Sequence, residues 1–98
     1  MSNRACKSSG DIATTAAVTT VPCLVWGITL RSGTTAGKII LQDGNGGTAK
    51  WTITTIASTA AGDAVNSISF AKPLIFTSSC YAVMSGTAAV GLVEYEVM

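Results

Sequence analysis

Apolar and polar side chains alternate at every second position along most of this chain, in short runs separated by glycine-rich turns. Alternation with a period of two predicts β-strands, and almost no stretch has the 3.6-residue period of a helix. The predicted strands cover residues 13–20, 23–31, 38–42, 49–56, 65–70, 74–77, 80–85 and 88–97. About seven or eight short strands indicate an all-β protein.

The expected architecture is a single small antiparallel β-sandwich with a jelly-roll-like topology. Closing two sheets over one core limits the number of exposed strand edges, which favours a jelly roll. The pattern is also compatible with an immunoglobulin-like strand order. The first twelve residues are polar and have no period, so we expect residues 1–12 to form an N-terminal arm and residues 13–98 to form the sandwich domain.

Two neighbouring strands, 38–42 and 49–56, form the clearest local prediction. Between them lies Asp43-Gly44-Asn45-Gly46-Gly47, and glycine and asparagine adopt a positive φ at little cost. The sequence therefore predicts a β-hairpin. Ile39, Leu41, Trp51 and Ile53 should point to the core.

The run 23–31 is apolar on both faces. Its bulky residues at even positions, from Leu24 to Leu30, are predicted to face the core, while Cys23, Val25, Gly27 and Thr29 would face outward. A strand that is uncharged on both faces is typical of a position covered on both sides. In the last run, Val93, Tyr95 and Val97 alternate with Glu94 and Glu96, which predicts one apolar and one solvated face.

One core can be built from the large apolar residues at the inward positions of these strands. The predicted core consists of Leu24, Trp26, Ile28, Leu30, Ile39, Leu41, Trp51, Ile53, Ile68, Phe70, Phe76, Tyr81, Val83, Val93 and Tyr95.

The composition changes the picture, because only 6 Lys/Arg and 5 Asp/Glu occur among 98 residues and histidine is absent. An ordinary soluble domain has roughly 25 % charged residues. A surface this poor in charge is suited to being covered by other protein. The charges are scattered, which argues against a nucleic-acid partner. The longest apolar stretch, 21–30, is too short to cross a bilayer and the first residues resemble no secretory signal, so we expect a cytoplasmic product without a membrane anchor.

Candidate chemistry is weak throughout. A hydrolase would need a lysine in place of the missing histidine as its base. Glu94 and Glu96 share a strand face, where solvated glutamates usually only confer solubility, and the glycine-rich segment 43–47 lacks the spaced acids of a calcium loop. The sequence thus predicts no enzyme, with no catalytic, cofactor-binding or metal-binding residues and no cofactor.

The three cysteines, Cys6, Cys23 and Cys80, are odd in number and have no metal-ligand spacing. We interpret them as reduced thiols. Cys23 and Cys80 are expected to behave as small apolar residues of strands.

Several runs resemble small virion proteins of tailed bacteriophages, particularly those of marine and cyanobacterial podovirus-like phages. The resemblance rests on the style of the strands and turns in 24–30, 32–37, 39–44 and 81–90, and it extends over roughly three-quarters of the chain. It implies a capsid decoration or cement protein, or part of a knob or fibre.

The predicted function is therefore a non-enzymatic virion structural protein, made in the host cytoplasm. Its partners would be the major capsid protein or other virion subunits, and further copies of itself in a homotrimer. The predicted contacts are Arg4 and Lys7 of the arm, on a neighbouring subunit, and the outward residues Cys23, Val25 and Thr29. The alternatives are a carbohydrate- or receptor-binding β-sandwich module, as at a fibre tip, and a cellular β domain of another role.

Overall fold

The computed structural model describes residues 6–56 and 64–98. Every regular element in these two ranges is a strand. The eight strands are β1 (Lys7–Ser8), β2 (Ala16–Thr19), β3 (Cys23–Arg31), β4 (Lys38–Asp43), β5 (Ala49–Thr54), β6 (Val65–Phe76), β7 (Cys80–Ser85) and β8 (Val90–Val97).

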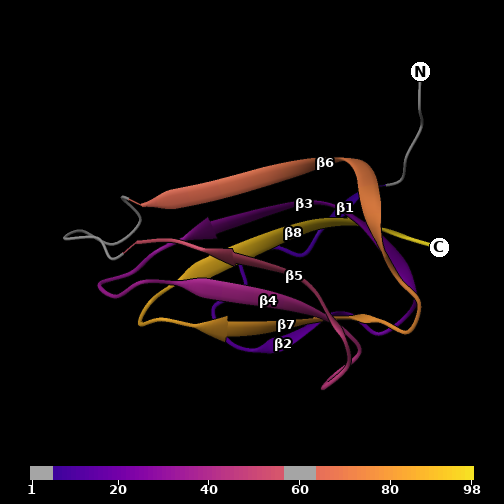
Figure 1. The fold of residues 1–98 in the computed structure, drawn as a ribbon, viewed down its shortest axis with the longest axis horizontal. Helices are drawn as coiled ribbons and strands as arrows, with labels where there is room; N and C mark the ends of the chain where they lie inside the picture. Colours follow the sequence, from indigo (N-terminus) through magenta and orange to yellow (C-terminus); the bar gives the residue numbers. More distant parts are fainter. Residues whose placement is uncertain (1–5, 57–63) are drawn as a thin grey trace.

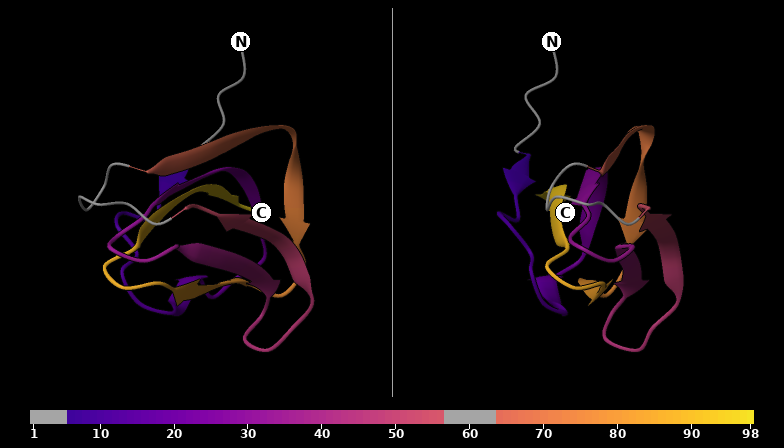
Figure 2. Two further views of the ribbon diagram at one scale, coloured as in Figure 1. Left: turned by 60° about the vertical axis from the view of Figure 1, so that its left-hand side comes forward. Right: turned by 90° about the vertical axis from the view of Figure 1, so that its left-hand side faces the viewer.

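The strands form two antiparallel four-stranded sheets that face each other. One sheet has the order β1-β8-β3-β6 and the other has the order β2-β7-β4-β5 (Figure 1). β4 and β5 are neighbours in one sheet, whereas all other successive strands lie in opposite sheets, as the turned views also show (Figure 2). These two strand orders are those of a jelly roll. The predicted all-β sandwich is confirmed.

The predicted hairpin is confirmed as β4 and β5. Ile39 pairs with Ile53, and Leu41 pairs with Trp51. Ile39 and Leu41 are fully buried, whereas Trp51 lies at the sandwich margin and is 37 % exposed. Its ring packs nearly perpendicular to that of Phe70 in β6, at a centroid distance of 5.1 Å. This contact between the edge strands β5 and β6 covers one open side of the core.

The predicted faces of β3 are wrong in its first half. Cys23 and Val25 are fully buried, and so are Ile28 and Leu30. The inward positions change from odd to even because a β-bulge interrupts the pairing of β3 with β8 between Val25 and Gly27. The extra residue at this bulge is Trp26, so the strand resumes with the opposite alternation.

The predicted faces of β7 are also wrong. Its fully buried residues are the small Cys80 and Ala82, whereas Tyr81 and Val83 are only partly buried. Ala82 pairs with the buried Leu41, which fixes this face as inward.

The buried apolar core otherwise includes most of the expected residues. It consists of Ile12, Cys23, Val25, Ile28, Leu30, Ile39, Leu41, Ile53, Phe76, Cys80, Ala82, Ala89 and Val93, with Val18, Ile68, Phe70, Leu74, Met84 and Tyr95 packed against it.

Much of the segment assigned to an arm belongs to the sandwich. Lys7 and Ser8 form β1, which pairs with Tyr95 and Glu94 of β8. Ile12 exchanges two backbone hydrogen bonds with Gly91, at 2.7 and 2.9 Å, and its side chain joins the core. One apolar residue in a polar segment has no period, which is why the sequence pattern did not indicate this strand.

The sequence predicts a break at Pro73, but β6 continues through it as an edge strand. Proline is tolerated there because an edge strand has one side without ladder partners. The pairing with β3 is nevertheless interrupted between Ser69 and Leu74, and β6 bends sharply toward its end (Figure 1).

Candidate interaction surface

The outer face of the β1-β8-β3-β6 sheet carries apolar side chains that the core does not use. Leu24 pairs with Ile75 of β6 and with Glu96 of β8, and Thr29 pairs with Leu92. Because paired residues point to the same side of a sheet, these side chains share the face opposite the core. We call this surface the outer face; its apolar members are Leu24, Trp26, Ile75 and Leu92.

The exposure of these residues is intermediate or high. Ile75 is 52 % exposed, and Leu24, Trp26 and Leu92 are half-buried. None of the four belongs to the core or to the partly buried residues packed against it. They are spread over β6, β3 and β8, with Leu24, Trp26 and Ile75 near one end of the sheet and Leu92, the partner of Thr29, nearer the other.

Acidic groups border this apolar surface. Glu94 and Glu96 alternate with Val93 and Tyr95, as predicted, and point outward. The indole Nε1–H of Trp26 donates a hydrogen bond to Oε1 of Glu96 at 3.1 Å. This bond positions the indole on the outer face. Gly27 lies beside it, and a Cβ there would be 3.1 Å from Oε1 of Glu94.

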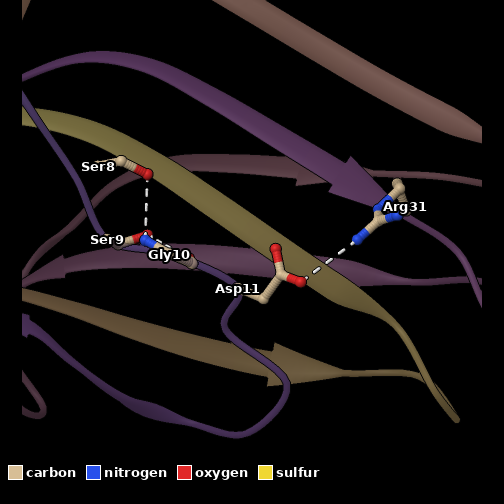
Figure 3. A network of polar contacts seen from close by, with 5 residues as sticks. All are labelled: Ser8, Ser9, Gly10, Asp11 and Arg31. Carbon is tan, nitrogen blue, oxygen red and sulfur yellow. Dashed lines mark hydrogen bonds and ion pairs between the residues drawn. The ribbon is translucent and has the colours of Figure 1, made fainter.

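A small cavity lies at the other end of the outer face. It has a volume of about 160 Å³ and is lined by Asp11, Thr29, Arg31, Val90, Gly91 and Leu92. Asp11 lies in the segment after β1 and faces Arg31, the last residue of β3 (Figure 3). Their closest atoms, Nη2 of Arg31 and Oδ2 of Asp11, are 3.6 Å apart. Both side chains are well exposed, so the ion pair stabilises little.

The segment that carries Asp11 is held by short polar contacts. Ser9 donates its backbone N–H to the carbonyl of Val93, and its Oγ accepts the N–H of Val93 at 2.9 Å. Oγ of Ser8 accepts the N–H of Gly10 at 3.1 Å (Figure 3). Asp11 is therefore fixed at the rim of the cavity by the backbone around it.

The predicted contact residues are separated by the fold. Thr29 lies on the outer face, where its Oγ1 is 2.9 Å from Oγ of Ser67. Lys7 is exposed on the edge strand β1, and Arg4 lies outside the described residues. Cys23 and Val25 are fully buried, which excludes them from any surface contact.

Sequence reasoning missed the outer-face roles of Leu24, Trp26, Ile75 and Leu92. The available signal was Gly27, because an isolated glycine inside a strand pattern indicates a β-bulge.

Asp43 is the most strongly hydrogen-bonded carboxylate among the described residues, and its role is structural. Oδ1 accepts the N–H of Ser78 at 2.8 Å, and Oδ2 accepts the N–H and the hydroxyl of Thr77 at 3.1 and 2.9 Å. These bonds, that of Ser78 first, lower the pKa of Asp43 to about 2. The carboxylate thereby joins the end of β4 to the β6–β7 turn.

Within residues 6–56 and 64–98, no group of three His, Cys, Asp or Glu side chains is arranged to hold a metal ion. The same ranges contain no helix long and apolar enough to span a membrane.

No protein-family model, curated protein or solved structure matches this chain.

Proposed function

We propose that this protein is a structural component of a virion, decorating or cementing the capsid of a tailed phage. The observation that carries the proposal is the apolar outer face on a jelly-roll sandwich whose sequence has few charges. The jelly-roll architecture recurs in capsid and lectin domains. This analogy of fold supports the proposal, and the resemblance of the strand and turn sequences to small virion proteins of tailed phages adds to it.

In this proposal the outer face is the contact surface. Its contact residues are Leu24, Trp26 and Leu92, in place of the buried Cys23 and Val25 that the sequence had predicted. A closed ring of three copies buries such a patch without leaving a free end. The major capsid protein would cover what remains. The protein has no enzymatic role, requires no cofactor, and acts in the virion after synthesis in the host cytoplasm.

The test pairs two substitutions that each place a lysine on the outside of one sheet. Leu24→Lys introduces a positive charge into the outer face beside Glu96, whose carboxylate can pair with it and so keep the monomer folded. Ile40→Lys is the matched control, because Ile40 pairs with the partly buried Val83 on the outside of the opposite sheet. Circular dichroism should show both variants folded.

Sedimentation equilibrium should find the unsubstituted protein and Ile40→Lys as trimers and Leu24→Lys as a monomer. Purified phage particles should contain the unsubstituted protein or Ile40→Lys, but not Leu24→Lys. The proposal is wrong if the unsubstituted protein is a stable monomer at high concentration and the native particles lack it.

The cavity beside Asp11 favours a second candidate, a carbohydrate- or receptor-binding module. Its rim presents a carboxylate, a hydroxyl and a guanidinium next to the apolar Leu92. Such a mixture of polar groups and apolar surface suits a sugar ring. Glycan-array binding that Arg31→Ala abolishes and Leu24→Lys preserves would favour this function over capsid decoration.

A further inference from the structure

Two cysteines from opposite sheets meet at one end of the sandwich. Cys23 is the first residue of β3, and its register partner in β6 is Phe76, the last residue of that strand. Only residues 77–79 separate Phe76 from Cys80, the first residue of β7 in the other sheet. The crossing turn therefore brings Cys80 to the same end of the sandwich as Cys23.

Both thiols are fully buried and both belong to the same core cluster. Because both buried side chains point into the space between the sheets at the same end of the sandwich, the two thiols face each other across it. All three cysteines are free thiols in the structure, and Cys6 is exposed. A disulfide has an S–S bond of about 2.05 Å and requires the Cβ atoms of the two residues to lie about 3.5–4.5 Å apart.

We propose that Cys23 and Cys80 are a redox-sensitive pair that a peroxide converts into a disulfide joining the two sheets. The bond would close the end of the sandwich where Asp43 already joins β4 to the β6–β7 turn.

Either thiol can act as the nucleophile, and the other then resolves the sulfenic acid; both orders give the same disulfide.

The reaction balances in two steps, written here with Cys23 as the nucleophile. The sulfur of Cys23 attacks one peroxide oxygen, the O–O bond breaks, and a sulfenic acid and one water form. The sulfur of Cys80 then attacks the sulfur of Cys23, the S–O bond breaks, and the hydroxyl leaves as a second water with the proton of Cys80. Two thiols are oxidised, and one peroxide is reduced to two waters.

The bond has a consequence that can be measured. It closes a long loop from residue 23 to residue 80 and so restricts the unfolded chain. For a domain of this size, we expect the melting temperature to rise by about 10 °C or more. Because both thiols are fully buried, the reaction rate depends on how often this end of the sandwich opens.

The experiment uses the Cys6→Ser protein, which has no exposed thiol. The folded protein is treated with hydrogen peroxide, unfolded, alkylated and digested. The expected result is a peptide pair linked through Cys23 and Cys80, no alkylation of either, and a raised melting temperature that dithiothreitol reverses. Peptide masses separate this product from methionine oxidation.

The matched control is Cys6→Ser with Cys80→Ala, in which Cys23 should stop at the sulfenic or a higher acid and no rise in melting temperature should occur. If that variant does not fold, the linked peptide pair in the Cys6→Ser protein decides the question alone. The proposal is overturned if both thiols remain open to alkylation, or if each is oxidised singly without a linked pair.

Discussion

Strands β3 and β8 lie side by side in the same sheet, yet only one of them has the faces that its sequence predicts. In β8, Glu94 and Glu96 point outward while Val93 and Tyr95 contact the core, as expected. In β3, the two halves of the strand have opposite alternation. The first half buries the odd positions up to Val25, and the second buries the even positions from Ile28.

The difference arises from the free-energy cost of turning each strand over, so that its outward side chains would point into the core. Turning β8 over would bury two carboxylates, which is strongly unfavourable without partners. Turning the first half of β3 over exchanges Cys23 and Val25 for Leu24 and Trp26, all of them apolar. Local sequence therefore leaves the faces of β3 undecided, and the pairing with β8 and β6 decides them.

The largest expected effect comes from a charge placed before the bulge. Val25→Glu buries a carboxylate without a partner, which should cost about 3–5 kcal/mol and leave the protein mostly unfolded. Thr29→Glu places the same side chain on the outer face and should change stability by less than about 1 kcal/mol. Urea unfolding of both proteins measures the difference. A folded Val25→Glu protein would contradict the bulge.

A second pair compares identical substitutions on the two sides of the bulge. Leu30→Ala removes a fully buried side chain and should cost about 2–5 kcal/mol. Leu24→Ala removes a half-buried side chain from the outer face and should cost about 1 kcal/mol or less. Equal losses in thermal unfolding would show that Leu24 is also part of the core.

The same contrast explains how much of the fold the sequence could predict. The β4–β5 hairpin was predictable because its turn glycines, Gly44 and Gly46, have φ values of +88° and +78° that favour glycine. The antiparallel β-sandwich of about seven or eight strands followed from alternation and turn spacing, whereas these patterns did not separate a jelly roll from an immunoglobulin-like strand order.

The candidate surface was not predictable from local pattern. The bulge at Trp26 reverses the alternation of β3, and in β7 the small Ala82 is buried where the bulkier Val83 was expected. Both outcomes depend on neighbouring strands that are distant in sequence. The position of Ile12 in the core has the same cause, because Gly91 of β8 holds its backbone.

Carboxylates provide a third comparison, between the exposed Glu94 of β8 and the hydrogen-bonded Asp43. The pKa of Asp43 falls from an ordinary value of 3.8 to about 2 on folding. A depressed pKa stabilises the fold fully above about pH 4, and this contribution is lost as the pH falls toward 2. We expect a falling melting temperature over that interval, measured by circular dichroism.

The control for this effect is Asp43→Asn. An amide NH₂ group would face donors that now approach Oδ2, so the melting temperature at pH 7 should fall by several degrees. The variant should also lose much of the acid sensitivity between pH 4 and 2. An unchanged acid profile would show that other groups determine it.

The smallest expected effect concerns the acceptor for Trp26 at the bulge. Glu96→Ala removes the hydrogen bond to the indole Nε1–H, which should cost less than about 1 kcal/mol because the partly exposed indole can bond to water instead. Glu96→Gln keeps an acceptor oxygen and is the matched control.

In a Trp51→Phe background, the fluorescence of Trp26 reports only this site. We expect Glu96→Ala to shift its emission to longer wavelength and Glu96→Gln to leave it in place, because only the former removes the acceptor of this hydrogen bond. Equal spectra for all three proteins would mean that the carboxylate of Glu96 does not determine the environment of Trp26.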